Sequence, residues 1–335
     1  MIGAVAAALT VAAAAGTLAV RGRRAARRFD ALLDERLPRG ADGIVVGAGP
    51  IDLPGDRSRA ALLLHGFGDT PQSLTAVACR LHAAGWAVHA PLLPGHGRTL
   101  RAFAGTGAGD WIGTARHALG ELRARHDTVV VVGQSMGGAL GVIVTAEALG
   151  RAEDGLAPIA SLVLLAPYLG MPAGVRLIAP IARALAPLWP YHDGGAGSRS
   201  IQDEVERQRS RGYGFLPGVL LAELARVVDR ARAALPRVHV PTLVVQSRAD
   251  HRITPAVCED AYARLGAPVK ELVWLDASGH VIAADRERLR VAGMVVEWVD
   301  RRGSRVAGGD DGYVEESTVE QELAPAPDAR SAQPG

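Results

Sequence analysis

The sequence has few cysteines and few aromatic residues. Its two cysteines, Cys79 and Cys258, are too far apart to give a disulfide framework or a zinc-ligand spacing. We interpret both as small buried residues of amphipathic helices. Aromatic residues make up only 4% of the 335 residues, so alanine, valine and leucine must supply most of the core.

Lysine is almost absent, because Lys270 is the one lysine among 37 lysines and arginines. No arginine-rich patch is interleaved with aromatic residues, which argues against a nucleic-acid partner. The sequence also lacks a cluster of metal ligands and a phosphate-binding glycine loop, so we expect neither a metal nor an organic cofactor. With 48% hydrophobic residues, the chain is long enough to bury one large catalytic core.

The two ends of the sequence differ from the rest. Residues 1–20 carry no charge, and as a helix they would be about 30 Å long, the thickness of a bilayer's hydrocarbon core. We interpret residues 1–28 as a membrane anchor whose basic flank, RGRRAARR, places the catalytic domain on the cytoplasmic side. A secretory signal or a soluble cytoplasmic protein with an alanine-rich helix are the alternatives. Residues 302–335 are acidic and predict a disordered tail.

Strand-like and helix-like segments alternate through the remaining domain, residues 29–301. Apolar runs predict buried strands at 43–48, 61–66, 86–93, 128–133, 161–167, 241–247 and 270–276. Such alternation is typical of an α/β fold, in which a mostly parallel sheet has helices on both faces. It is interrupted at about 168–240, which we interpret as a helical lid over the carboxyl edge of the sheet.

Residues 129–141 read VVVVGQSMGGALG, a buried strand followed directly by a tight turn and the start of a helix. Gly133 to Gly137 match the pattern G-x-S-x-G, in which a strained turn exposes a nucleophilic serine, here Ser135. The pattern alone is weak evidence, because a chain with 40 glycines produces it readily by chance. Its interpretation therefore depends on the acid and the histidine that follow.

Asp250 and His280 each come just after one of the last two expected strands. We expect His280 to act as general base toward Ser135, and Asp250 to orient the imidazole. Two other histidines are rival bases, but His251 adjoins Asp250 and His239 precedes its strand. The predicted catalytic residues are therefore Ser135, Asp250 and His280.

Two backbone N–H groups must stabilise the oxyanion that forms in acyl transfer. We expect them to be those of Met136, at the start of the helix after the serine, and Phe67, in the loop HGFGD. Four apolar side chains of the lid are candidates for binding an acyl chain: Leu177, Ile181, Leu185 and Trp189. Packing of the lid on the core explains these four equally well.

Five segments resemble, in chain order, bacterial carboxylesterases and monoacylglycerol lipases of the α/β-hydrolase superfamily: GAGPIDLPG…ALLLHGFGDTPQSL, APLLPGHGRT, VVGQSMGG, VVQSRADHRI and SGHVIAADRERL. The resemblance covers about residues 44–300 and is weakest in the lid. It implies an α/β-hydrolase fold, the triad of Ser135, Asp250 and His280, the oxyanion hole named above, and a lid that lines the acyl pocket. Gly68 is a departure, because many relatives carry threonine there.

The predicted activity is hydrolysis of carboxylic esters, such as monoacylglycerols or short- and medium-chain acyl esters, through an acyl-enzyme on Ser135. The expected partners are a small-molecule or lipid ester and, through residues 1–28, a membrane. An acyltransferase with the same triad and a non-catalytic, membrane-tethered scaffold are the alternatives, since a fold alone does not determine function. The sequence does not determine the oligomeric state.

Overall fold

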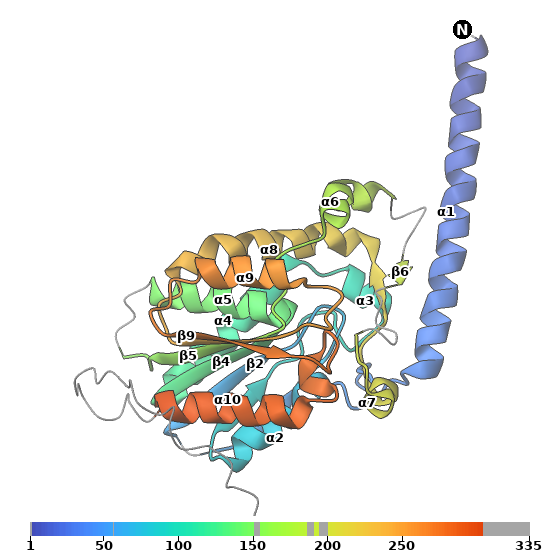
Figure 1. The fold of residues 1–335 in the computed structure, drawn as a ribbon. Helices are drawn as coiled ribbons and strands as arrows, with labels where there is room; N and C mark the ends of the chain where they lie inside the picture. The colour runs from blue at the N-terminus through green and yellow to red at the C-terminus, as the bar shows by residue number, and fades with distance from the viewer. Residues whose placement is uncertain (1, 56, 151–154, 186–190, 194–199, 304–335) are drawn as a thin grey trace, which may run out of the picture.

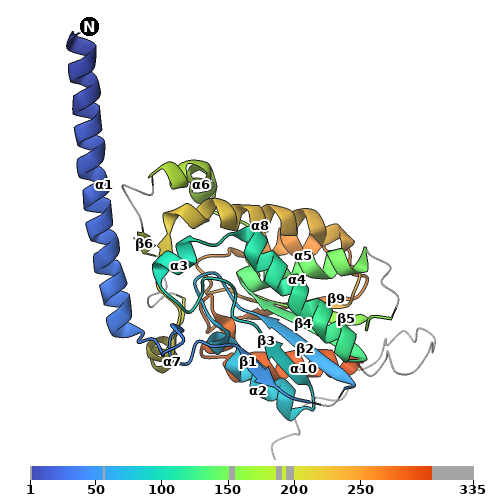
Figure 2. The same cartoon turned by 180° about the vertical axis from the view of Figure 1, so that it is seen from behind.

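The computed structural model describes residues 2–55, 57–150, 155–185, 191–193 and 200–303. Its central sheet has seven strands: β1 (Ile51–Leu53), β2 (Arg59–Leu64), β3 (Ala87–Ala90), β4 (Thr128–Gln134), β5 (Ile159–Leu165), β8 (Thr242–Ser247) and β9 (Lys270–Leu275). They lie in the order β1-β3-β2-β4-β5-β8-β9, and each neighbouring pair is parallel except β1 with β3. Figure 2 shows β1 and β3 at one side of the sheet and β9 toward the other. The predicted α/β-hydrolase fold with a mostly parallel sheet is confirmed.

The central strands explain the unbroken apolar runs of the sequence. Every residue of β4 and β5 is buried, because helices cover both faces of the sheet, and valine and leucine therefore replace the alternation of a half-exposed strand. Leu64 of β2 pairs with Gly133 of β4, and Gln134 pairs with Leu165 of β5. The carboxyl ends of these strands therefore meet at one edge of the sheet.

Two layers of helices cover the sheet (Figures 1 and 2). One face carries α4 (Ala108–Arg125), α5 (Met136–Leu149), α8 (Leu221–Ala234) and α9 (Pro255–Arg264), and the other carries α2 (Thr75–Ala83) and α10 (Arg288–Gly303). The shorter helices are α3 (Leu100–Ala104), α6 (Ala173–Leu185) and α7 (Glu204–Arg209). β6 (Tyr191–Asp193) and β7 (Phe215–Pro217) form a separate two-stranded antiparallel sheet. The 3-10 turns are η1 (Pro71–Leu74), η2 (Gly218–Leu220), η3 (Leu235–Arg237) and η4 (Ile282–Ala284).

The strand expected at residues 43–48 is wrong. Gly43 and Gly47 have φ angles of 72° and 81°, and these left-handed residues interrupt an extended segment. Val45 forms a single bridge with Arg39, and its side chain is buried. The strand at this edge of the sheet is instead β1, which pairs antiparallel with β3.

The two cysteines have different surroundings. Cys258 is buried in α9, and burial raises the pKa of its thiol to about 12. Cys79 is exposed on α2, so the expectation that both cysteines are buried is wrong for Cys79. The apolar pattern of α2 instead buries its neighbours Val77, Ala78 and Leu81.

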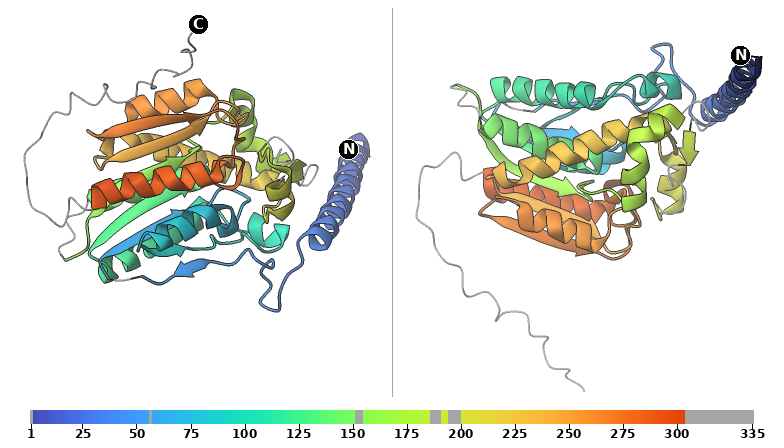
Figure 3. Two further views of the ribbon diagram at one scale, coloured as in Figure 1. Left: turned by 60° about the horizontal axis from the view of Figure 1, so that its bottom comes forward. Right: turned by 90° about the horizontal axis from the view of Figure 1, so that it is seen from above.

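The insertion between β5 and β8 consists of two different parts. α6 and the two-stranded sheet of β6 and β7 lie at the carboxyl end of the central sheet (Figure 3). α8 instead packs against α5, and Val227 of α8 is fully buried there. The second half of the predicted lid at 168–240 is therefore a helix of the sheet-covering layer, which also contributes side chains to the site.

The N-terminal helix α1 (Ile2–Arg36) is continuous and projects from the domain (Figures 1 and 2). It runs past the expected boundary at residue 28, and Leu33 and Leu37 are each 1% exposed in the core. In the part of the chain that the structure describes, no helix combines the length and the apolar character needed to cross a membrane. The anchor expected at residues 1–28 stays a prediction.

The C-terminal helix α10 extends to Gly303, slightly past the domain end expected at residue 301. The remainder of the predicted acidic tail, from residue 304 onward, lies outside the described residues.

Candidate active site

Ser135 lies at the sharp turn between β4 and α5. Its φ of 55° and ψ of −118° are unusual for a residue other than glycine. The flanking glycines are required by close packing, because a Cβ at Gly137 would lie 1.9 Å from the carbonyl oxygen of Leu64. A Cβ at Gly133 would lie 2.3 Å from the carbonyl oxygen of Gly137. The G-x-S-x-G pattern therefore has a steric cause in this fold.

Ser135, His280 and Asp250 form one hydrogen-bonded chain. Oγ of Ser135 lies 2.7 Å from Nε2 of His280, and Nδ1 of His280 lies 2.7 Å from Oδ2 of Asp250. The three residues follow β4, β9 and β8, so the carboxyl ends of three strands bring them together. All three are buried, with exposed fractions of 9%, 3% and 6%. In this arrangement the imidazole can accept the proton of the serine hydroxyl while the carboxylate holds Nδ1–H.

The carboxylate of Asp250 has partners besides His280. Gln246 donates its side-chain N–H to Oδ2 at 2.9 Å, and the backbone N–H groups of Arg252 and Ile253 donate to Oδ1 at 2.7 and 3.1 Å. Burial alone would raise the pKa of Asp250, but the charge and hydrogen bond of His280 and the two backbone donors hold it below its usual range. The carboxylate is therefore ionised at neutral pH and can stabilise an imidazolium. Gln246 was not predicted, because nothing in the apolar pattern of β8 distinguishes it.

The two expected oxyanion donors lie on the segments that meet at Ser135. Met136 is the first residue of α5, and Phe67 follows β2 in a loop whose Gly66 is so close that a Cβ there would lie 3.3 Å from Cβ of Ser135. Within the described residues, the backbone N–H groups of Phe67 and Met136 donate to no protein acceptor. Both groups are therefore available to an oxygen bound beside the serine.

His65 holds the loop that carries Phe67. Its ring is fully buried, Nε2 accepts a hydrogen bond from the backbone N–H of Leu93 at 3.1 Å, and Nδ1 lies 3.0 Å from the carbonyl oxygen of Gly66. Burial lowers the pKa of His65 to about 4, so the ring is neutral at neutral pH and Nδ1–H is the donor. His96 packs edge-to-face on this ring, with the centroids 4.9 Å apart, and burial holds its pKa well below the usual range.

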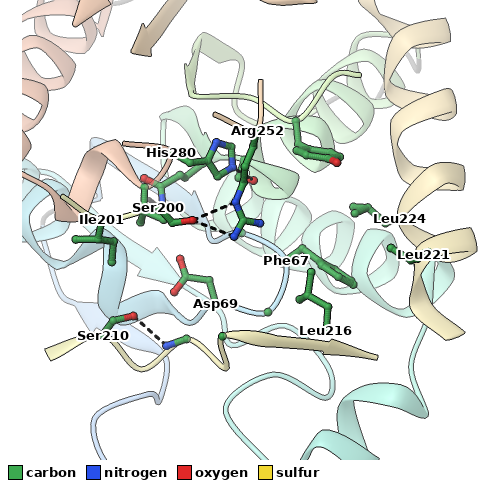
Figure 4. A pocket seen from close by; sticks show the side chains of 18 of the residues that line it. Phe67, Asp69, Ser200, Ile201, Ser210, Leu216, Leu221, Leu224, Arg252 and His280 are labelled. Carbon is green, nitrogen blue, oxygen red and sulfur yellow. Dashed lines mark hydrogen bonds between the residues drawn. The ribbon is translucent and has the colours of Figure 1, made fainter. Parts of the chain in front are cut away.

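A cavity of about 320 Å³ opens onto Ser135 and His280, and one side of it is apolar (Figure 4). The lining on this side includes Phe67, Val175, Ile178, Leu216, Leu221 and Leu224. Two of the lid residues expected to bind substrate do not line this cavity, since Leu177 and Ile181 are 79% and 54% exposed. The side chain of Leu185 and the whole of Trp189 lie outside the described residues.

The other side of the cavity carries polar groups that were not predicted: Asp69, Ser200, Ser210 and Arg252. Arg252 donates from Nε and Nη2 to Oγ of Ser200 at 3.1 and 2.9 Å, and the Asp69 side chain points toward them (Figure 4). Asp69 is partly exposed to the cavity, but its Oδ2 is buried and has no hydrogen-bond partner among the described residues. Burial raises the pKa of Asp69 to about 6, against the opposing effects of its hydrogen bonds and of Arg252.

Comparison with known proteins identifies similar sequences and folds. The sequence model of the family described as "Serine aminopeptidase, S33" matches residues 55–287. A thermostable monoacylglycerol lipase of Bacillus sp. strain H-257 is 29% identical over 252 residues, which cover 74% of this chain and 90% of that protein. A carboxylesterase of Bacillus subtilis strain 168 is 26% identical over 248 residues, which cover 72% of this chain and 93% of that protein.

A solved structure from work on LipS and LipT, two metagenome-derived lipolytic enzymes, has a similar fold. Its TM-score is 0.69 at 28% sequence identity, and the match covers 77% of this chain and 99% of that one. The monoacylglycerol lipase of Paleococcus ferrophilus has a TM-score of 0.63 at 19% identity, which shows likeness of fold, and covers 76% of this chain and 98% of that one.

Proposed function

This chain belongs to the serine aminopeptidase S33 family of α/β-hydrolases, and we propose that it hydrolyses carboxylic esters through an acyl-enzyme on Ser135. The observation that carries the proposal is the chain of two 2.7 Å contacts from Ser135 through His280 to Asp250, in which Ser135 and His280 line a partly apolar cavity. The family description mentions an aminopeptidase, but the similar proteins described above are named as lipases and a carboxylesterase. These names favour an ester rather than a peptide as the substrate.

The first half of the proposed reaction forms the acyl-enzyme. Nε2 of His280 takes the hydroxyl proton of Ser135 as Oγ bonds to the ester carbonyl carbon. The carbonyl oxygen becomes an oxyanion, which accepts hydrogen bonds from the N–H groups of Phe67 and Met136. The bond between the carbonyl carbon and the alcohol oxygen then breaks, and His280 gives its proton to the departing alcohol.

The second half returns the enzyme to its starting state. His280 takes a proton from a water molecule whose oxygen attacks the acyl carbon. The bond to Oγ of Ser135 then breaks, Oγ regains a proton from His280, and the carboxylic acid leaves. Throughout both halves the ionised Asp250 holds Nδ1–H and offsets the positive charge of the imidazolium. An acyltransferase would differ only here, with an alcohol or a thiol in place of water.

Within the ester class, we propose monoacylglycerols with short or medium acyl chains as substrates. The apolar side of the cavity suits an acyl chain, because its leucines and Phe67 would be removed from water on binding. On the polar side, the carboxylate of Asp69 can accept from a hydroxyl group and the guanidinium of Arg252 can donate to one. The glycerol moiety of a monoacylglycerol has two free hydroxyl groups, so one could donate to Asp69 while the other accepts from Arg252.

The test is hydrolysis of p-nitrophenyl esters of increasing acyl length by the whole protein and by Ser135→Ala. We expect turnover that disappears in the variant, a burst of p-nitrophenol when acylation outpaces deacylation, and an optimum in acyl length set by the cavity. Adding a primary alcohol distinguishes the acyltransferase, because ester formation would then exceed hydrolysis. Turnover that persists in Ser135→Ala, or a folded protein without turnover on any ester, would refute the proposal.

A further inference from the structure

Asp285 is a fully buried carboxylate that the proposed reaction does not use. It lies between η4 and α10, five residues after His280, and is 0% exposed. A carboxylate removed from water is tolerated only where hydrogen bonds replace those of the solvent. Within the described part of the chain, no arginine or lysine side chain forms an ion pair with Asp285. Its negative charge is instead held by backbone groups.

Four backbone N–H groups donate to this carboxylate. Gly279 donates to Oδ2 at 2.6 Å, Asp203 and Arg286 each donate to Oδ1 at 2.8 Å, and Gln202 lies 2.9 Å from both oxygens. The hydrogen bond from Arg286 is local, because the two residues are adjacent in the sequence. An acidic residue at this position near the start of α10 would form it whatever lies around it. Gly279 precedes Asp285 by six residues, whereas Gln202 and Asp203 precede it by 83 and 82. Asp285 therefore joins two segments that are far apart in the sequence.

The segments that Asp285 joins are those around the base and the cavity wall. Gly279 immediately precedes His280. Residues 200–203, here called the return segment, lie within the insertion and directly precede α7. Ser200 and Ile201 of the return segment line the cavity, and the carbonyl oxygen of Ser200 accepts a hydrogen bond from Val281 at 2.9 Å. The backbone N–H groups on both sides of His280 are therefore held by this arrangement, one by Asp285 itself and one by the return segment.

We infer that Asp285 is a positioning residue, which holds the backbone of His280 so that Nε2 meets the hydroxyl of Ser135. It acts through Gly279 directly and through the return segment and Val281 indirectly. The inference rests on the proposed function, since it assigns a role in the reaction of that site. It also makes the cavity wall and the base one unit.

The main test is Asp285→Asn, measured per active site after titration with a fluorophosphonate probe. Asparagine keeps the volume and one acceptor oxygen for Gln202 and Asp203, but its NH₂ group cannot accept from Gly279. We expect kcat to fall about 10- to 100-fold, as for loss of oriented general-base catalysis, with KM changed less than about threefold. Asp285→Glu, which keeps both acceptor oxygens, is expected to recover part of the lost kcat.

Glu287→Gln is the matched control. Glu287 is a carboxylate of the same loop that accepts from Ala277 N–H and the Ser278 hydroxyl, but among the described residues it has no hydrogen bond with Gly279 or the return segment. We expect this variant to keep kcat within about threefold even if it is less stable. An unchanged kcat in folded Asp285→Asn, or an equal fall in Glu287→Gln, would overturn the assignment to Asp285.

A second measurement uses the wild-type protein, so it does not depend on the folding of a variant. In hydrogen exchange followed by mass spectrometry, peptides covering residues 200–203 and 279–286 are expected to open at the same slow rate, because one carboxylate holds both. Exchange of one peptide at least tenfold faster than the other would contradict the inference. Matching exchange without any ester turnover would refute the proposed function alone.

Discussion

Gln246 donates its side-chain N–H to Oδ2 of Asp250 at 2.9 Å, and that same oxygen lies 2.7 Å from Nδ1 of His280. Two donors on one oxygen, together with the backbone donors on Oδ1, fix the rotation of the carboxylate. The direction of the imidazole therefore depends on a side chain that belongs to the interior of β8.

Replacing Gln246 by leucine tests this dependence. The variant keeps the side-chain volume but removes the donor, so we expect kcat to fall about 5- to 10-fold and the free energy of unfolding to fall by about 1 kcal/mol. Ester hydrolysis and urea denaturation measure the two effects. Gln208→Leu, an exposed change on α7, is the control and should alter neither; an unchanged kcat in Gln246→Leu would show that the other donors suffice.

Asp69→Asn is expected to change selectivity more than general activity. If the carboxylate accepts from a hydroxyl group of glycerol, the variant loses a charged acceptor, and hydrogen bonds to charged groups contribute about 1.5–3 kcal/mol. The ratio of kcat/KM for a monoacylglycerol to that for the methyl ester of the same acid should fall about tenfold. Because the kcat/KM values of two esters are measured on the same preparation, a partial loss of folded protein does not change their ratio. An unchanged ratio would remove Asp69 from the alcohol side of the site.

Stability is expected to decrease on mild acidification. In the folded protein the pKa of His65 is about 4, and the pKa of His96 lies well below its usual range. Below pH 6.5 the unfolded chain therefore binds protons at these two histidines that the folded chain does not bind. Each neutral histidine then loses about 1.4 kcal/mol of stability per pH unit as the pH falls. Asp69, with its pKa raised to about 6, has the opposite sign, because below pH 6 the folded chain holds a proton that the unfolded chain releases.

The effect of Asp69 offsets that of one histidine, so the effect of the other remains. We therefore expect the free energy of unfolding to fall by about 2 kcal/mol between pH 6.5 and 5. Urea denaturation at a series of pH values measures it. In His96→Gln the remaining effects of His65 and Asp69 nearly cancel, so the pH dependence should flatten. A wild-type protein whose stability rises or stays constant over this range would show that these rings are not held neutral.

The boundary between α1 and the domain predicts where truncation becomes harmful. Removal of residues 1–28 takes away the projecting part of the helix, and we expect the free energy of unfolding to change by less than about 1 kcal/mol. Leu33 and Leu37 are in the core, so their replacement by alanine should each lower it by about 2–4 kcal/mol. Thermal or urea denaturation compares the three proteins. Equal stability of the truncated chain and either leucine variant would contradict this boundary.

The sequence predicted the parts of the site that come from chain order. Ser135, Asp250 and His280 each follow an apolar run, and parallel strands carry their carboxyl ends to one edge, so residues far apart in the chain were expected to meet. Ser135 also had a local pattern, because only glycine fits where backbone segments approach as closely as they do at Gly137.

The cavity lining was not predictable in the same way. α6 presents Val175 and Ile178 to the cavity and leaves Leu177 and Ile181 exposed. Both pairs are apolar, so the helical period alone does not say which one faces the site. Asp69 and Arg252 are single polar residues of loops without periodicity, and their meeting depends on how β2 and β8 are placed in the sheet.

The order of the strands also bears on when the site comes into existence during synthesis. His280 follows Ser135 by 145 residues, which a ribosome adds in roughly 7–30 s at 5–20 residues per second. Until β9 has emerged and paired with β8, the serine is present without the histidine that we propose as its base. A nascent or prematurely terminated chain would therefore carry the nucleophile but be inert toward esters, and activity would appear only as the last strand joins the sheet.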